Sequence, residues 1–249
     1  MSSNSIKINC DMGEYFAFQK TDLNAKVMPY IDMANLACGF HAGDPVTMHQ
    51  SIKESIVNDV AIGAHPSYPD LAGFGRRPMQ CSVEEIVSFV IYQCGALDAL
   101  CKSYDTKIRY VKPHGALYNT MMQDTEVFKS IAKAISKYDT EIPLMILSST
   151  ENESYATLAN RYGISLLYEV FADRAYQDNG HLVPRSEEHA LLHSTHEILQ
   201  RAKILKEKGY IESINGKKIP LQSDTLCVHG DNPHAVEIIQ ALHRFNHEN

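Results

Sequence analysis

Short apolar runs alternate with longer segments of helical periodicity along almost the whole chain. The runs are rich in β-branched and aromatic residues and end in glycine, proline or polar residues, which is the pattern of buried strands. We expect strands near residues 6–9, 34–36, 60–64, 110–111, 144–147, 165–171 and 224–228. Helical patterns separate these runs, so the chain consists of repeated strand–helix units.

Repeated strand–helix units need right-handed crossovers, which leaves a closed barrel or an open doubly wound sheet. Polar loops follow nearly all of the expected strands, whereas an open sheet concentrates its site at one switch point. The pattern therefore favours an α/β fold built as a (β/α) barrel of about seven strands. Residues 210–219 stand apart, because Asn215-Gly216 between two short runs predicts a β-hairpin.

Capping residues mark the starts of the expected helices. Asp44 followed by Pro45 predicts a helix start, and the apolar positions of this helix at helical spacing include Ile56. Ser82 with Glu85 predicts a capping box at the start of a long helix. Further helices are expected over residues 124–138, over residues 151–162 and up to about residue 208.

Composition places the chain among ordinary globular proteins. It has 249 residues, 44% hydrophobic and 21% charged, and we expect one barrel domain over residues 1–249. The net charge of −7 gives no general attraction to nucleic acid or anionic membranes, and no apolar run approaches the roughly 20 residues that span a bilayer. Met1 opens no apolar signal segment, and the six cysteines form no Cys-x-x-Cys pair. We therefore expect a cytoplasmic protein with buried, reduced thiols.

Acidic, basic and imidazole side chains that could take part in catalysis follow most of the expected strands. After Tyr110-Val111 the chain breaks at Lys112, Pro113 and His114. Proline cannot donate to a sheet ladder, so the cation and the imidazole lie at the carboxyl end of a strand, where α/β folds place their chemistry. The candidate catalytic residues found in this way are Asp11, Glu14, His41, His65, Lys112, His114, Asp173, His229 and Asp231.

These residue types suit acid–base catalysis near neutral pH, because histidine titrates there and burial raises the pKa of a carboxyl group. Lys112 could hold a phosphate or polarise a carbonyl. Arg76, Arg77 and Arg185 lie in expected loops, as anion-binding arginines often do, with a surface salt bridge as the alternative for each. Isolated histidines also serve as hydrogen-bonding loop residues, and Asp231 is also a candidate helix cap.

Other motifs are weaker. His189 and His193 are four residues apart, a spacing that can bind metal, but a solvated helix face is the better interpretation. The Gly73-Phe-Gly75 pair is too short for a dinucleotide-binding fingerprint. Neither a Gly-x-x-x-x-Gly-Lys-Ser/Thr phosphate loop nor a Gly-x-Ser-x-Gly nucleophile elbow occurs.

Six motifs, in the same order over nearly the whole chain, resemble the signature of the LamB/YcsF family of lactam-utilisation proteins, which includes the A subunits of bacterial-type 5-oxoprolinases. The motifs are INCDMGE from Ile8, NLACGFHAGDP from Asn35, IGAHPSYPDLAGFGRR from Ile62, VKPHGALYN from Val111, EVFADRAY from Glu169 and CVHGDNPHAV from Cys227. The chain departs from the family pattern at Tyr15-Phe-Ala-Phe18, where a Ser-Phe-Gly type of sequence is expected. This departure leaves the shape of the first loop open.

The resemblance implies a barrel related to the glycoside hydrolase/deacetylase superfamily. It also implies ATP-dependent hydrolysis of 5-oxoproline to L-glutamate, with ATP and Mg²⁺ as co-substrate and with partner B and C subunits. The expected chemistry is phosphorylation of the amide oxygen by ATP, with Lys112 and an arginine at the phosphate, followed by attack of water assisted by a carboxylate–histidine pair. The candidate substrate- or phosphate-binding residues are Arg76, Arg77, Asn119, Arg174 and Arg185, and of these the resemblance carries over Arg76 and Arg174 as functional positions.

Three alternatives stay open at this point. The first is a metal-dependent amidase or carbohydrate deacetylase, with Asp11 and two of His41, His65 and His114 as ligands that activate a bound water. The second is a Schiff-base lyase that acts through Lys112. The third is a non-catalytic subunit that holds the lactam for its partners. The sequence is compatible with a homo-oligomer and does not fix the oligomeric state.

Overall fold

The structure, a computed structural model, describes residues 6–19, 21–184, 187–229 and 234–247. Within these residues, seven parallel strands close into a barrel in chain order, and the last strand pairs with the first. The strands are β1 (Lys7–Met12), β2 (Met33–Ala37), β3 (Ala61–His65), β4 (Tyr110–Val111), β5 (Leu144–Leu147), β6 (Leu166–Phe171) and β9 (Thr225–Cys227). The predicted (β/α) barrel of about seven strands is confirmed.

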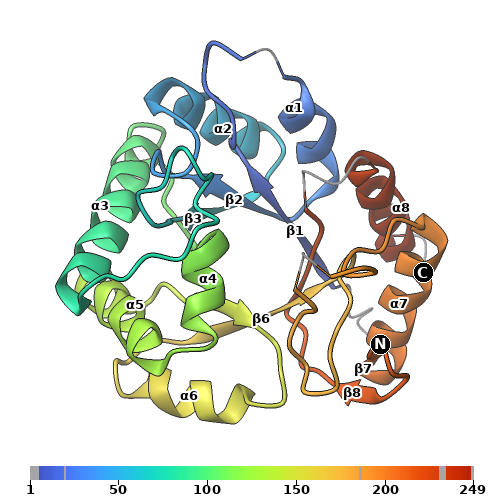
Figure 1. Cartoon of the computed structure of the whole chain (residues 1–249). Helices are drawn as coiled ribbons and strands as arrows, with labels where there is room; N and C mark the ends of the chain where they lie inside the picture. Colours follow the sequence, from blue (N-terminus) through green and yellow to red (C-terminus); the bar gives the residue numbers. More distant parts are fainter. Residues whose placement is uncertain (1–5, 20, 185–186, 230–233, 248–249) are drawn as a thin grey trace.

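Helices surround the barrel (Figure 1). They are α1 (Leu23–Val27), the 3-10 helix η1 (Met28–Tyr30), α2 (Pro45–Val57), α3 (Val83–Lys102), α4 (Gly115–Met121), α5 (Thr125–Tyr138), α6 (Asn152–Asn160), α7 (Thr195–Lys208) and α8 (Ala235–His247). Buried apolar residues of the helices and of the barrel strands belong to one hydrophobic core, because a sheet buried on both sides needs a second layer. The predicted hairpin forms a separate two-stranded sheet of β7 (Tyr210–Glu212) and β8 (Lys218–Pro220).

The capping residues act as predicted. The side chain of Asp44 accepts hydrogen bonds from two backbone N–H groups at the start of α2, whose first residue is Pro45. Ser82 and Glu85 form the capping box of α3. Ile56, which we expected on the buried face of α2, is 45% exposed. The reason is that the residues of α2 that face the barrel include Ser55 in its place.

Two segments differ from the helical pattern expected for them. Helix α4 begins directly after the β4 motif, at Gly115, whereas we expected helix to resume only at Asp124. Residues 187–194 are not helical, and His189 has a positive φ of 64°. His189 and His193 therefore do not share a helix face, and that interpretation was wrong, although both side chains are exposed.

Inward-pointing side chains fill the barrel in layers. The layer near the amino ends of the strands is apolar and contains Met33, Tyr110 and Met145, packed with Ala61 and Leu167. Two residues further along their strands come Asn35, Lys112 and Glu169. Successive side chains of a strand alternate between the two faces, so these residues point to the same interior, nearer the carboxyl ends. The barrel therefore has an apolar base and a polar layer above it.

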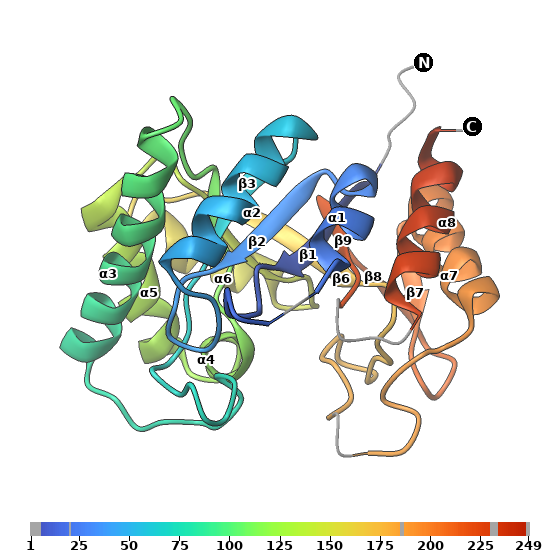
Figure 2. The same ribbon diagram turned by 90° about the horizontal axis from the view of Figure 1, so that it is seen from above.

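Two long connections project from the same side of the barrel in Figure 2. They are residues 66–82, between β3 and α3, and residues 172–194, between β6 and α7. Both follow the carboxyl ends of strands, so they extend the walls above the polar layer. Among the described residues no helix is long and apolar enough to cross a membrane. All six cysteines are free thiols, and all but the half-buried Cys81 are buried.

Candidate active site

A cavity of about 430 Å³ opens at the carboxyl ends of the barrel strands. Its volume falls in the range of roughly 300–1,000 Å³ that is usual for small-molecule sites. The predicted residues that line it are Asp11, His65, Arg76, Lys112, His114, Asn119, Arg174 and His229. Glu14, His41 and Asp173 contact these lining residues through hydrogen bonds, ion pairs or ring stacking. The structure thus brings together side chains that lie far apart in the sequence.

Lys112 occupies the floor of the cavity and is only 3% exposed. Its ammonium group donates to Asn9 Oδ1 at 3.2 Å, to Asp11 Oδ1 at 3.1 Å and to Cys227 Sγ at 3.3 Å. It also forms an ion pair with Glu169 Oε1 at 2.7 Å. Burial opposes the charge of Lys112, but the neighbouring acidic groups outweigh burial and raise its pKa well above the ordinary value. Lys112 is therefore a charged ammonium with all three of its hydrogens engaged.

Asp11 stays ionised although it is almost buried. Burial alone would raise its pKa, but Lys112 and His65 lower it well below the ordinary value. Asn35 Nδ2 donates to Asp11 Oδ1 at 2.8 Å and to Asn9 Oδ1 at 2.9 Å, and Tyr110 holds Asn35 through a 2.7 Å hydrogen bond. This network fixes the Asp11 carboxylate at the cavity wall.

Sequence reasoning missed Glu169, Asn9 and Asn35. Glu169 is fully buried and accepts a hydrogen bond from the hydroxyl of Tyr118 at 3.2 Å. The signal for Glu169 was present, because a carboxylate in the middle of an apolar strand rarely lies inside without a partner. It occurs two residues before Phe171 and four before Asp173, so all three share one face of β6 and its extension.

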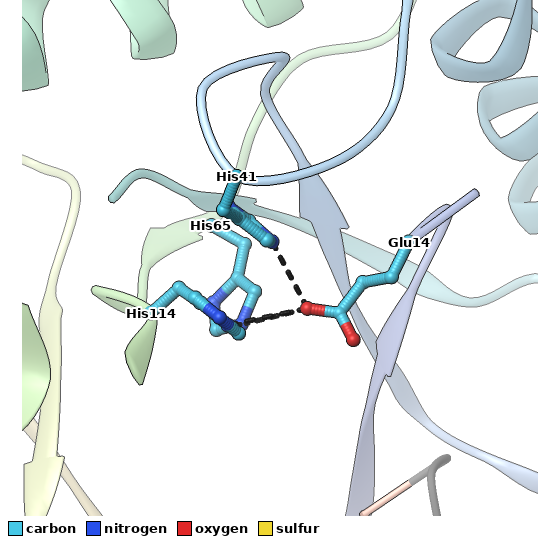
Figure 3. A group of neighbouring side chains, drawn as sticks. All are labelled: Glu14, His41, His65 and His114. Carbon is cyan, nitrogen blue, oxygen red and sulfur yellow. Dashed lines mark hydrogen bonds and ion pairs between the residues drawn. The ribbon is translucent and has the colours of Figure 1, made fainter. Parts of the chain in front are cut away.

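The second wall of the site is a cluster of one carboxylate and three imidazoles, Glu14, His41, His65 and His114 (Figure 3). Glu14 Oε1 lies 2.9 Å from His41 Nε2, 3.2 Å from His114 Nδ1 and 3.9 Å from His65 Nε2. Burial would raise the pKa of Glu14, but its hydrogen-bond contacts with His114 and His41 lower it below the ordinary value. Burial lowers the pKa of His41 to about 4, so this imidazole is neutral at pH 7.

His65 has the opposite balance. Burial disfavours its charged form, but the charge and hydrogen bond of Asp11 outweigh burial and raise its pKa above the ordinary value. His65 Nε2 lies 3.5 Å from Asp11 Oδ1 and 3.0 Å from His114 Nδ1. His65 therefore connects the lysine–carboxylate floor with the histidine cluster.

The β3–α3 connection folds over the histidine cluster. The ring of Phe74 contacts the rings of His41 and His114 edge-on, with centroids 5.6 and 5.4 Å apart. Gly75 has a φ of 65°, and a Cβ there would lie 2.8 Å from side-chain atoms of both His41 and His114. Gly75 thus serves a close backbone approach to the imidazoles, whereas a Cβ at Gly73 would meet the side chains of Asp70 and Arg77.

The opposite side of the cavity carries an aspartate–histidine pair. His229 Nδ1 donates to Asp173 Oδ1 at 3.0 Å, and the backbone N–H of His229 donates to Asp173 Oδ2 at 3.4 Å. The ring of Phe171 stacks on His229 with centroids 5.1 Å apart. Because Nδ1 is held by Asp173, Nε2 is the nitrogen left for a bound molecule. Such a pair can accept or deliver a proton.

Two predicted binding residues make structural contacts within the protein. Arg77 does not line the cavity but forms an ion pair with Asp70, so its alternative role as a salt bridge is the one observed. Arg174 lines the cavity, yet its guanidinium donates to the backbone carbonyls of Val183 and Ala190 and holds the 172–194 connection. Arg185 and Asp231 lie outside the described residues.

Taken with the fold, this geometry defines a (β/α)-barrel protein with a carboxylate–histidine–lysine pocket at the carboxyl ends of its strands. The chain belongs to the LamB/YcsF family, whose sequence profile matches residues 6–249. It is 49% identical over 242 residues to the 5-oxoprolinase A subunit of Vibrio campbellii, an alignment that covers 97% of this chain and 96% of that protein. It is 44% identical over 237 residues to the 5-oxoprolinase A subunit numbered 3 of Pseudomonas aeruginosa, covering 95% of this chain and 94% of the relative.

One solved structure agrees with this assignment, and a second shares the fold. The crystal structure of a lactam utilization protein from Thermus thermophilus superposes with a TM-score of 0.90 at 36% identity, covering 98% of this chain and 96% of that one. A cellobiose-phosphate cleavage protein from Enterococcus faecalis V583, described as putative by its authors, superposes with a TM-score of 0.58 at 13% identity, covering 96% and 91% of the two chains. The second likeness shows a shared fold alone.

Proposed function

We propose that this chain is the substrate-binding and catalytic A subunit of an ATP-dependent 5-oxoprolinase, which opens 5-oxoproline to L-glutamate together with B and C subunits. The observation that carries the proposal is the similarity, over nearly the full length of both chains, to proteins named as the A subunit of 5-oxoprolinase. The cavity supports it, because its volume suits a small lactam and its walls carry acid–base groups on two sides.

The reaction needs an activated amide, since a five-membered lactam is stable at neutral pH. In the proposed sequence the γ-phosphoryl group of ATP moves to the lactam oxygen, and ADP leaves. Water then adds to the ring carbon, the carbon–nitrogen bond breaks, and the nitrogen takes a proton. The resulting γ-glutamyl phosphate is hydrolysed by a second water to glutamate and inorganic phosphate. The sum is one lactam, one ATP and two waters giving glutamate, ADP and phosphate.

We assign each side chain a role in this reaction from its position in the cavity. The Asp173–His229 pair is suited to removing a proton from water or protonating the ring nitrogen, because His229 Nε2 is left for the cavity. Asp11 and Lys112 provide a fixed charge pair on the floor. The hydrogens of Lys112 are engaged, so we assign it to holding Asp11 and Glu169, and we assign phosphate contact to Arg76 at the cavity rim.

The nucleotide site is shared with a partner subunit in this proposal. The chain has no Gly-x-x-x-x-Gly-Lys-Ser/Thr loop for ATP. Mg²⁺ enters with ATP as part of the co-substrate.

The test measures glutamate and ADP release from 5-oxoproline by the purified chain, by the B and C subunits, and by all three together. We expect coupled release of both products only from the complete mixture, and a loss of about 100-fold or more in glutamate release for His229→Asn. His193→Asn, at an exposed histidine away from the cavity, is the matched control. Glutamate release without ATP, or no release from the complete mixture, would contradict the proposal.

Two of the alternatives make predictions that differ from this proposal, one at Lys112 and the other at His229. A Schiff-base lyase needs a neutral lysine, and the raised pKa of Lys112 makes that form rare near pH 7. Trapping with borohydride in the presence of the lactam should therefore give no adduct. A non-catalytic binding subunit predicts that His229→Asn keeps nearly full turnover in the assembled enzyme, which the assay above measures directly.

A further inference from the structure

We propose that Glu14, His41, His65 and His114 bind one divalent transition-metal ion of the Zn²⁺ type at the edge of the cavity. One ligand atom from each residue lies within 4.8 Å of all the others. Three of the four side chains are buried, and Glu14 is half-buried. The proposal rests on this geometry and does not depend on the reaction proposed above.

The tautomers of two histidines carry the first argument. His65 Nδ1 lies 2.6 Å from the carbonyl oxygen of Lys112, and His114 Nε2 lies 2.9 Å from the carbonyl oxygen of Phe74. A carbonyl oxygen only accepts, so each of these nitrogens carries a hydrogen. The other nitrogens of the two rings, His65 Nε2 and His114 Nδ1, face each other at 3.0 Å. Each offers a lone pair to an ion when its ring is neutral.

Two ring nitrogens at this distance need a proton or a metal ion between or beside them. Glu14 adds a carboxylate oxygen 3.2 Å from His114 Nδ1, and His41 adds a ring nitrogen 2.9 Å from that oxygen. Metal–ligand bonds of about 2.0–2.2 Å place neighbouring ligand atoms about 3–4 Å apart. Four of the observed separations, 2.9, 3.0, 3.2 and 3.9 Å, lie close to this spacing, and all four ligand atoms lie within 4.8 Å of one another.

The outer contacts of the cluster are the second argument. Histidines that bind metal usually donate their other ring N–H to a backbone carbonyl or carboxylate, which fixes the ring and its tautomer. His65 and His114 both do so here, to the carbonyls of Lys112 and Phe74. Each ring is thus held with a nitrogen aimed at the centre of the cluster before any ion arrives.

The donor set selects the kind of ion. Imidazole suits Zn²⁺, Cu, Fe and Ni, whereas Mg²⁺ and Ca²⁺ prefer oxygen ligands. The ion is therefore distinct from the Mg²⁺ that accompanies ATP. The sequence pointed to Asp11 with two of the histidines as ligands, but Asp11 is engaged by Lys112 and Asn35, and Glu14 takes its place. His65 and His114 line the cavity, so a bound ion would border it.

The experiment uses the full chain, purified, stripped with a chelator and dialysed. Calorimetric titration with Zn²⁺ alone should give one ion per chain, and Co²⁺ should give the visible spectrum of a nitrogen-rich site. His41→Ala and Glu14→Gln should each weaken Zn²⁺ binding by more than the roughly 10–100-fold that loss of an outer partner costs. His196→Ala, at an exposed histidine, is the control and should bind like the wild type.

Circular dichroism of each variant checks that the barrel is folded, and Glu14→Gln keeps the size of the side chain. Mg²⁺ in excess should not displace Zn²⁺. Wild-type protein that takes up no stoichiometric Zn²⁺ or Co²⁺ would overturn the proposal and would mean that a shared proton, not a metal, lies between the imidazoles. Equal uptake by the cluster variants and the control would also overturn it. Glutamate release is scored separately, so failure to bind Zn²⁺ would leave the proposed reaction standing, and absence of glutamate release would leave the metal site standing.

Discussion

Glu169 on β6 and Lys112 after β4 form an ion pair of 2.7 Å, and neither side chain is more than 3% exposed. The pair spans the barrel interior past β5, which lies between β4 and β6 in the sheet. Charges taken out of water are stable only with partners that compensate the lost hydration. Asp11, Asn9 and Cys227 supply further contacts to Lys112, and Tyr118 supplies one to Glu169. The buried charges at the floor of the cavity therefore form one network, in which each charge is paired or hydrogen-bonded.

Breaking this pair should destabilise the protein. We expect Glu169→Gln to lower the free energy of unfolding by about 3 kcal/mol, because Lys112 would keep its charge and lose one of its two carboxylates. Glu126→Gln is the matched control, since Glu126 pairs with Lys129 at the same 2.7 Å but with 67% and 32% of the side chains exposed. The control should change stability by less than about 1 kcal/mol. Urea unfolding measures both, and equal losses would contradict the role given to the buried pair.

Replacing Asp173, the partner of His229, should reduce turnover without preventing substrate binding. We expect Asp173→Asn to lower kcat of the assembled enzyme by about 100- to 10,000-fold, because the neutral amide no longer stabilises a charged imidazole or fixes its tautomer. The assay is glutamate release in the presence of B and C subunits, with KM measured in parallel. A change in KM with kcat intact would show that the pair only binds substrate.

Gly63 should not tolerate a side chain. A Cβ at this position would lie 2.2 Å from ring atoms of Tyr110, which is fully buried in the apolar base of the barrel. We expect Gly63→Ala to lower the free energy of unfolding by about 1–3 kcal/mol through overpacking. Gly95→Ala is the control, since no atom lies within 4 Å of a Cβ there and the residue is inside helix α3. This substitution should raise stability by roughly 0.5–1 kcal/mol.

The cysteines should differ sharply in reactivity. Burial raises the pKa of every thiol except that of Cys81 far enough to suppress the thiolate, to about 12 for Cys38 and Cys101, and these side chains are also shielded. Cys81 is the half-buried one, with a smaller rise in pKa. Iodoacetamide at pH 8 should therefore label Cys81 first in the native protein, as read by mass spectrometry of peptides. Labelling of Cys227 at a similar rate would contradict the closed floor of the cavity.

Several features could be predicted because their signals are local. The caps at Asp44 and Ser82 act within one turn of helix, and the polar breaks after the strands depend on neighbouring residues alone. Other features could not be predicted in this way. Arg77 and Asp70 pair across a loop whose path depends on Gly75 packing against the histidines, and Arg174 turns to carbonyls of a connection without regular pattern.

The sequence by itself determined that strands and helices alternate, that the strands number about seven, and that acids, imidazoles and a lysine follow their carboxyl ends. These conclusions rest on periods of two and 3.6 residues and on caps, which are properties of short segments. Only the tertiary structure decided which of these side chains meet. Closure of the barrel brings Glu14 against His114 and Lys112 against Glu169, and such contacts depend on the register between strands, which no short segment encodes.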